Sequence, residues 1–295
     1  MDEFTPFERS AFAGGLEFRW LTANTYEIRL PNGKTILIDP FLVPESETEE
    51  LYRKYICGYT AGSLERVDYV LITHPHFDHI YSVAEVFEKF NPWILCHSSY
   101  AIRMTKDLMI PQQFIVPFEH GQTIEFDDFT LETLTSRHLY GHLLDKEGHA
   151  ARFPGELPCP CRGSVLEPLD DYGGMFNTDF IITTKNNLRI GTAGGPFADY
   201  VSNKYRRAGL NVLMRQCGYE MRIGDVKTVA QDLTDTGAEL LLPMHHERVY
   251  GAMDTVAFSG EVNRELATRG YAGRMFVPER GRWYKLGVSV CANGE

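Results

Sequence analysis

The chain has 295 residues, of which 43% are hydrophobic, so it can form one large domain or two small ones. Its net charge of −11 at pH 7 repels phosphate backbones, which argues against nucleic acid as a partner. It has no apolar run of membrane-span length, and its acidic opening lacks the basic start of a secretory signal, so we expect a cytoplasmic protein with no membrane partner and with free or metal-bound cysteines.

The first third of the sequence predicts strands joined by turns and short helices. Strand residues run from 16 to 30 and resume at TILIDPFL, with the turn Pro31-Asn32-Gly33-Lys34 between them. The apolar run VDYVLIT, residues 67–73, is typical of a buried strand. The capping-box pattern Ser82-Val83-Ala84-Glu85 then predicts a helix to about Phe90.

The same alternation continues toward the C-terminus. PWILC predicts a strand, and Ser98 or Ser99 is placed to cap a helix through Leu108. FIVPF, QTIEF and FTLETLT predict three more strands, and FNTDFIITT with NLRIGTA predicts a hairpin. A helix from about 225 to 235 and strands in AELLLPM and GRWYKLGVSV complete the pattern. We expect an α/β chain of two sheets covered by helices.

The segment THPHFDH directly follows the strand at 67–73. It places His74, His76, Asp78 and His79 within six residues, at a turn between a predicted strand and a predicted helix. Imidazole and carboxylate groups that converge at such a turn suit a divalent cation such as zinc, manganese or iron. We therefore predict a metal site at this strand end.

THPHFDH resembles the His-x-His-x-Asp-His signature of the metallo-β-lactamase superfamily. ILIDPFL, GQTIEFDDFTLETLTSRH and LLLPMHHE resemble further stretches of that family in the expected order. The resemblance implies a four-layered αβ/βα sandwich over a single domain, 1–295, with loop insertions at about 43–64 and 139–175. Within the superfamily, NLRIGTAGGPFADYVSNKYRRAG and PMHHE look most like the ascorbate-6-phosphate lactonase-type hydrolases.

The resemblance assigns six ligands to two metal ions: His74, His76 and His138 to the first, and Asp78, His79 and His245 to the second. It implies a hydrolase in which a metal-bound hydroxide attacks a small-molecule ester, lactone or phosphoester. It also implies a homo-oligomer. Asp39, which ends a strand before Pro40, either supports a ligand histidine by a hydrogen bond or is a simple turn aspartate.

One position departs from the family. An aspartate usually bridges the two metals, and in this chain that position reads Gly195. Without a carboxylate between them, two dications repel strongly. Three outcomes are open: one metal on three imidazoles with Asp78 free to orient the water, two metals with Asp199 as a substitute bridge, or a metal-binding, non-catalytic or sensor protein on the same fold.

Four further metal-type residues lie in the insertion at about 139–175: His142, His149, Cys159 and Cys161. They offer the ligands of a structural zinc site, but the Cys-x-Cys spacing is tight, which favours an ordinary loop over the active site. His142 would then be able to contact substrate. His97 and His120 have no partners at ligand spacing, so we expect ordinary loop or core residues.

Lys204, Arg206 and Arg207 form a compact basic cluster. They would bind an anionic substrate, or they belong to a solvated helix face. The primary hypothesis is a metal-dependent hydrolase of a small molecule, with zinc or manganese preferred over iron. A nuclease is disfavoured by the charge of the chain, and di-iron redox chemistry by the missing carboxylate.

Overall fold

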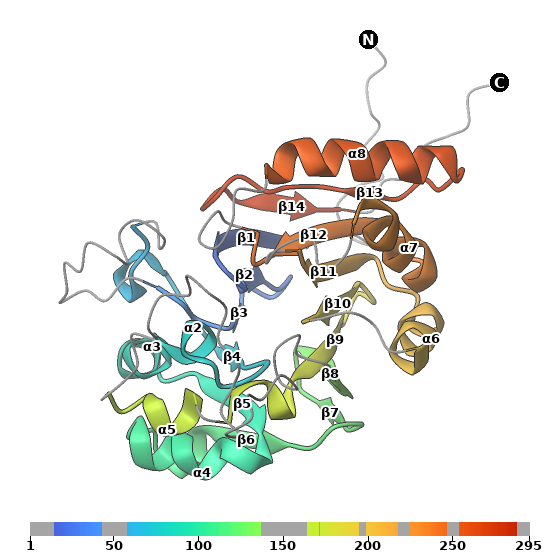
Figure 1. The fold of residues 1–295 in the computed structure, drawn as a ribbon. Helices are drawn as coiled ribbons and strands as arrows, with labels where there is room; N and C mark the ends of the chain where they lie inside the picture. The colour runs from blue at the N-terminus through green and yellow to red at the C-terminus, as the bar shows by residue number, and fades with distance from the viewer. Residues whose placement is uncertain are drawn as a thin grey trace, which may run out of the picture.

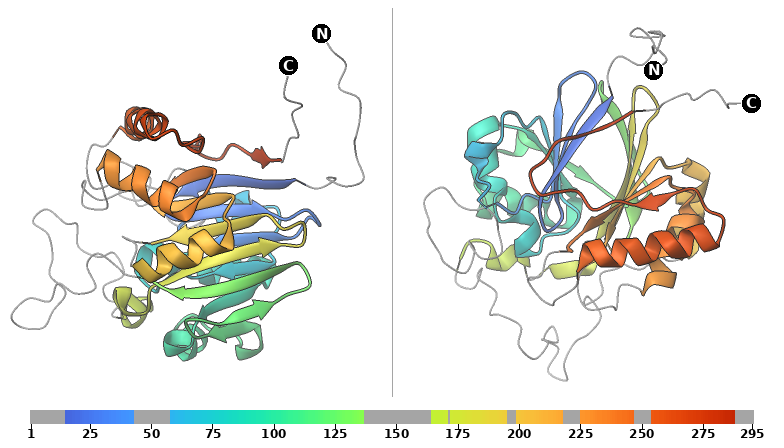
Figure 2. Two further views of the ribbon diagram at one scale, coloured as in Figure 1. Left: turned by 90° about the vertical axis from the view of Figure 1, so that its right-hand side faces the viewer. Right: turned by 90° about the horizontal axis from the view of Figure 1, so that it is seen from above.

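The computed structural model describes residues 15–42, 58–136, 164–170, 172–194, 199–217, 225–246 and 254–287, with only the backbone of 174–175 and 199–203. These residues form two seven-stranded sheets that pack face to face, with helices on both outer sides (Figures 1 and 2). The predicted four-layered αβ/βα sandwich is confirmed. The division of the chain into domains stays a prediction. Every described helix is too short or too polar to span a lipid bilayer.

The first sheet combines the N-terminal strands with the last described strand. In spatial order it contains β14 (Tyr284–Leu286), β1 (Leu16–Thr22), β2 (Thr25–Arg29), β3 (Thr35–Ile38), β4 (Tyr69–Leu71), β5 (Trp93–His97) and β6 (Ile115–Phe118). β14, β1, β2 and β3 pair antiparallel, whereas β3 to β6 run parallel. The parallel strands bring their carboxyl ends to one edge of the sheet.

Helices cover the outer face of this sheet. The described elements are η1 (Ala61–Ser63), α2 (Phe77–Ile80), α3 (Val83–Phe90), α4 (Ser98–Asp107), η2 (Gln112–Phe114), α5 (Glu167–Asp170) and η3 (Gly173–Phe176). The sequence of β4 is continuously apolar because both faces of this strand are buried. Val70 packs outward under the helices, whereas Tyr69 and Leu71 pack inward between the sheets.

The second sheet is built from the rest of the chain. In spatial order it contains β13 (Arg274–Met275), β12 (Leu240–Met244), β11 (Val212–Gln216), β10 (Arg189–Ala193), β9 (Thr178–Thr184), β8 (Phe129–Thr135) and β7 (Thr123–Glu125). β10 to β13 are parallel and β7 to β10 antiparallel. Its outer face is covered by α6 (Asp199–Ala208), α7 (Val226–Thr236) and α8 (Thr255–Thr268) (Figure 2).

The space between the sheets is an apolar core to which both contribute. Phe118 of the first sheet meets Phe180 of the second edge to face, with ring centroids 5.6 Å apart. One buried polar contact also crosses this layer. The Tyr26 hydroxyl in β2 donates to the carbonyl of Pro243 in β12 at 2.7 Å. Because Pro243 lies two residues before His245, this bond fixes the end of β12 against the first sheet.

Three local predictions need correction. The strand residues from 16 to 30 are divided by a tight turn at Ala23, whose φ is 42°. Ser82 precedes α3 as expected, but no capping box forms, because its hydroxyl bonds instead to the backbone N and O of Leu42. The cap of α4 is His97, whose Nδ1 accepts from the N–H of Ser99 at 3.2 Å.

The two predicted insertions are described in part. Residues 58–64 of the first include η1, and the described part of the second contains α5 and η3. The hairpin at Asn186-Asn187 is confirmed, and so is the helix that ends at Gly237, where φ is 73°. α8 was not expected from the sequence.

Removing the Tyr26 hydroxyl should destabilise the protein. Tyr26→Phe leaves the buried Pro243 carbonyl without its donor, so we expect the free energy of unfolding to fall by about 1–3 kcal/mol in urea titrations. Tyr284→Phe is the control, since its hydroxyl bonds to the exposed Glu279 backbone, where water can substitute. Equal effects of the two substitutions would contradict the role assigned to Tyr26.

Candidate metal centre

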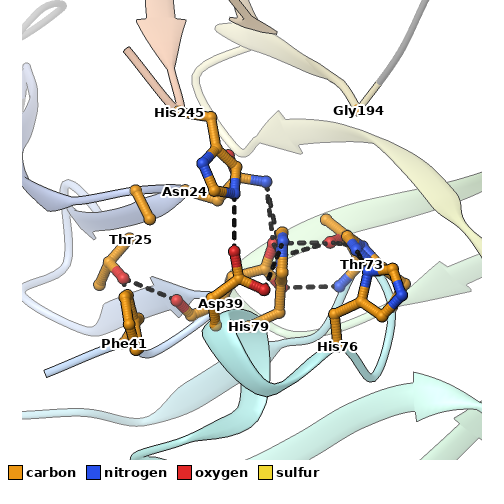
Figure 3. Close-up of polar contacts among 12 residues, drawn as sticks. Asn24, Thr25, Asp39, Phe41, Thr73, His76, His79, Gly194 and His245 are labelled. Carbon is orange, nitrogen blue, oxygen red and sulfur yellow. Dashed lines mark hydrogen bonds and ion pairs between the residues drawn. The ribbon is translucent and has the colours of Figure 1, made fainter. Parts of the chain in front are cut away.

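The predicted metal-binding residues meet at the edge where the parallel strands of both sheets end. His74 follows β4, and His76 is the residue immediately before α2. Asp78 and His79 lie within α2, whose first N–H is capped by Asp170 at 2.8 Å. His245 follows β12 of the opposite sheet. Residues from the two layers therefore face one another across this edge (Figure 3).

Asp78, His79 and His245 form a group with metal-binding geometry. One ligand atom from each lies within 4.8 Å of the other two. His245 Nε2 is 3.1 Å from one carboxylate oxygen of Asp78, and His79 Nε2 is 3.8 Å from the other. The side chains of His79 and Asp78 are 1% and 14% exposed, so a cation bound here would be largely withdrawn from water.

His74 and His76 make a second imidazole pair beside this group. His74 Nε2 lies 3.0 Å from His76 Nδ1, and the His74 ring is 3.8 Å from that of His79 between centroids. Gly173 packs directly against His76. A Cβ added at Gly173, whose φ is 49°, would meet His76 Nε2 at 2.9 Å. Because Gly173 packs against Nε2 of His76, the nitrogen of His76 that faces His74 Nε2 is Nδ1.

Asp39 holds the ligand histidines in orientation. Its carboxylate lies 2.7 Å from His79 Nδ1 and also accepts from the Thr73 N–H at 2.8 Å and the Thr73 hydroxyl at 2.6 Å (Figure 3). A carboxylate accepts only, so His79 Nδ1 carries a proton and its Nε2 keeps the lone pair a metal needs. From the sequence, Asp39 was either a support for a ligand histidine or a simple turn residue. The structure shows its contact with His79.

Thr73 extends the same orientation to His74. Its hydroxyl gives its one hydrogen to Asp39, so it accepts from His74 Nδ1, which is 3.0 Å away. His74 Nε2 is then the unprotonated nitrogen. One carboxylate thereby sets the tautomers of two imidazoles.

The backbone around the centre includes three residues other than glycine in the left-handed region. Their φ angles are 42° for Ala23, 44° for Asp39 and 51° for His245. The His245 N–H donates to the Ala23 carbonyl at 3.0 Å, so two of them stabilise one another across the sheets. Such conformations cost energy and gather at functional sites.

Protonation states at the centre suit a cation. Burial lowers the pKa of His76 to about 4, so its imidazole is neutral. Burial opposes ionisation of Asp78, but the neighbouring His79 and the hydrogen bond from His245 hold the Asp78 pKa well below its ordinary value. Burial also opposes the charge of His79, yet Asp39 and Asp78 raise its pKa above the ordinary value.

Comparisons with known proteins identify the fold and a set of related sequences. Residues 18–151 match the family model of the metallo-beta-lactamase superfamily. The structure is similar to that of Igni18, a metallo hydrolase from the archaeon Ignicoccus hospitalis, over 93% of this chain and 99% of that one, with a TM-score of 0.64 and 14% identity. The chain has the metallo-β-lactamase fold. The family model covers 134 of the 295 residues, so the sequence match and the fold similarity point the same way over the first half of the chain.

Curated relatives match over shorter stretches of the chain. A UPF0173 metal-dependent hydrolase from Koribacter versatilis is 35% identical over 82 residues, which cover 28% of this chain and 31% of that protein. Another from Salinibacter ruber is 28% identical over 167 residues, or 55% of this chain and 61% of that protein. The chain thus spans less than two thirds of the length of these relatives.

Several predicted residues lie outside the described part of the chain. They are His138, His142, His149, Cys159, Cys161 and Gly195, and Asp199 is described only by its backbone at the start of α6. His246, the residue after His245, lies within the described part. Its ring packs against Trp20 with centroids 4.1 Å apart and planes inclined at 35°, whereas His245 turns toward Asp78.

The basic cluster lies at the other end of the second sheet. α6 follows β10 and runs back, so its last residue, Ala208, contacts Arg189 at the first residue of β10. On this helix Arg206 bonds to Asp235 of α7, and Lys204 forms an ion pair with Glu132 at 3.0 Å. This placement favours the solvated helix face over a substrate contact.

Sequence reasoning missed a second pair of histidines on the metal edge. The rings of His97, at the end of β5, and His120, just after β6, lie 4.6 Å apart between centroids. His97 Nε2 is 3.3 Å from Glu119, and His120 Nε2 is 3.0 Å from the Thr178 hydroxyl. Only the parallel pairing of β5 with β6 brings them together, so no spacing in the sequence could have revealed them.

Asp179 is a buried carboxyl that the sequence did not single out. Gly194, at the end of β10, donates its N–H to Asp179 Oδ1 at 2.8 Å. Burial raises the pKa of Asp179 to about 7, although hydrogen bonds from Gly194, Ser136 and Tyr205 oppose the increase. The carboxyl is therefore protonated in much of the folded protein below neutrality and holds the strand end that leads to Gly195.

Replacing Asp39 should weaken metal binding without distorting the backbone. Asn tolerates the left-handed conformation but cannot supply the carboxylate that fixes His79 and, through Thr73, His74. We expect Asp39→Asn to lower the affinity for Zn²⁺ or Mn²⁺ by about 10–100-fold in calorimetric titrations. The exposed Asp127→Asn is the control. Unchanged affinity in Asp39→Asn would remove Asp39 from the metal centre.

Asp179 should make stability depend on pH. Because the folded pKa lies above the unfolded value, the stabilising contribution of the protonated carboxyl is full below pH 4 and lost as pH rises through about 7. Asp179→Asn is neutral throughout. Between pH 4 and about 7, we expect the free energy of unfolding of the natural protein to fall by up to about 4 kcal/mol relative to that of this variant. Urea titrations at several pH values measure this difference. Parallel pH curves would contradict the raised pKa.

Proposed function

We propose that the chain is a metal-dependent hydrolase that acts on a small-molecule ester, lactone or phosphoester. The observation that carries the proposal is the convergence of Asp78, His79 and His245 within 4.8 Å at the edge shared by both sheets. The names of the curated relatives, UPF0173 metal-dependent hydrolases, support the same reaction type.

The donor set fits a divalent cation. Asp78, His79 and His245 would hold one ion, and His74 with His76 would hold another together with the predicted ligand His138. Imidazole nitrogens mixed with one carboxylate favour zinc, manganese or iron over magnesium or calcium. A bound cation of this kind supplies Lewis acidity and lowers the pKa of a coordinated water.

The chain's own residues would orient the reacting groups. Asp78 is ionised and reaches the same space as His79 and His245, so its free lone pairs are placed to accept a hydrogen bond from the attacking water. Asp39 and Thr73 keep the imidazoles in fixed tautomers throughout. The burial of this edge limits competition from bulk water.

The substrate class is supported by the sequence resemblance to lactonase-type hydrolases after β10. Lactones and phosphorylated sugars are therefore the first compounds to screen. Because the bridging position is Gly195, the centre would hold either a single metal or two metals with Asp199 as the bridge. The measured metal content decides between these alternatives. A non-catalytic metal sensor on the same fold would bind the cation and turn nothing over.

Activity should depend on the cation and on Asp78. Removing metal with a chelator should abolish hydrolysis of a panel of esters, lactones and phosphodiesters, and Zn²⁺ or Mn²⁺ should restore it. Asp78→Asn keeps the shape of the side chain but removes its charge, so we expect kcat/KM to fall by more than about 100-fold and metal content to fall with it.

The matched control is Asp127→Asn, an exposed aspartate in the turn between β7 and β8. It should retain both metal and activity. Metal bound at full stoichiometry with no turnover on any substrate in the panel would favour the sensor. A protein that binds neither Zn²⁺ nor Mn²⁺ after refolding with either ion would overturn the proposal.

A further inference from the structure

Asn177, between η3 and β9, occupies a central position at the metal edge. The next residue, Thr178, donates its N–H to the carbonyl of Thr73, the residue before His74. The Asn177 carbonyl accepts from the N–H of Ser136, two residues before the predicted ligand His138. Asn177 and Thr178 therefore connect the strand end that leads to His74 with the strand end that leads toward the predicted ligand His138.

The Asn177 side chain also borders the strand end that departs from the family. An ideal Cβ built on Gly194 would lie 2.9 Å from Asn177 Nδ2 and 3.4 Å from Oδ1. Gly194 directly follows β10, and Gly195, where the family carries its bridging aspartate, is the next residue. The amide thus fills the space beside Gly194, at the strand end that leads to Gly195.

The amide is fully buried and has no hydrogen-bond partner among the described residues. Asn177 is 0% exposed, and neither its Oδ1 nor its Nδ2 is bonded to any residue that the structure describes. Leaving two such atoms unsatisfied destabilises the folded state, so they are rare in folded proteins unless a ligand or water completes them. This is the observation that points to a bound group at Asn177.

We propose that the Asn177 side chain is an oxygen donor to the metal centre, in place of the carboxylate that Gly195 lacks. The inference rests on the proposed metal-dependent function. An amide oxygen coordinates divalent cations but carries no charge. It therefore supplies a ligand without offsetting the repulsion between two dications, and the second ion binds more weakly than it would with a carboxylate.

Two substitutions of similar shape separate this role from a structural one. Asn177→Asp adds the missing charge, so we expect affinity for the second equivalent of Zn²⁺ or Mn²⁺ to rise by about tenfold or more. Asn177→Leu removes both polar atoms. We expect it to lower metal affinity by about tenfold or to lose one equivalent, while the Tm of the metal-free protein stays the same or rises by a few degrees.

The experiment uses the full chain stripped of metal, with titration calorimetry for affinity, elemental analysis for stoichiometry and thermal unfolding for the metal-free state. Thr184→Val is the control. Thr184 is the last residue of β9, the strand that begins just after Asn177, and this substitution removes a buried hydroxyl remote from the metal edge. It should lower Tm without changing metal binding.

Each outcome bears on a separate statement. Natural affinity and stoichiometry in Asn177→Leu would overturn the inference while leaving the metal-dependent function intact. A lower metal-free Tm with unchanged metal binding would assign Asn177 a structural role and likewise overturn it. If Asn177→Leu fails to fold, unchanged metal affinity in Asn177→Asp decides against the inference. Absence of metal binding in the natural protein would remove the proposed function itself.

Discussion

The contacts of the Asp39 carboxylate are the interaction on which the candidate centre depends. This fully buried group receives the N–H and hydroxyl of Thr73 and binds His79. Its backbone carbonyl accepts from the Thr25 hydroxyl at 2.7 Å, which anchors β2 as well. A buried carboxylate is costly unless its lone pairs are satisfied, and here each bond that satisfies it also orients a residue of the centre.

The sandwich architecture explains why the centre lies where it does. Both sheets run their parallel strands toward the same edge, where backbone groups are no longer used in strand pairing. α2 begins there, and its N-terminus is capped by Asp170, so the polar side chains of His76, Asp78 and His79 remain available to one another. The Tyr26–Pro243 bond and the Ala23–His245 bond hold the second sheet against this set. The left-handed conformation of His245 is part of that docking.

The sequence was most informative where the signal was local. The strand before His74, the hairpins and the helix ending at Gly237 follow from periodicity and turn residues, and the histidine motif identified the edge of the sheet. α8 was missed because its buried positions, chiefly Val262 and Leu266, are too sparse to make a clear apolar pattern. The capping box at Ser82 failed because a neighbouring loop at Leu42 offered its hydroxyl better partners.

Non-local contacts could not be read in the same way. His97 and His120 meet only through the register of β5 and β6. The burial of the Asn177 amide, without a hydrogen-bond partner among the described residues, follows from the packing of segments that are distant in the sequence. Asp39 was predicted only in part: its position at the end of a strand followed from the sequence, but its hydrogen-bond partners did not. The predicted ligand His138 and the position of Gly195 fall outside the described residues.

Within the described residues, the chain passes from the first sheet to the second between β6 and β7 and returns between β13 and β14. A polypeptide severed between β6 and β7 would yield one fragment with His74, His76, Asp78 and His79 and another with His245, and the latter would also carry the strand that completes the first sheet. Neither fragment alone would contain the whole donor set. Cation uptake by a mixture of the two would therefore report complementation between the halves.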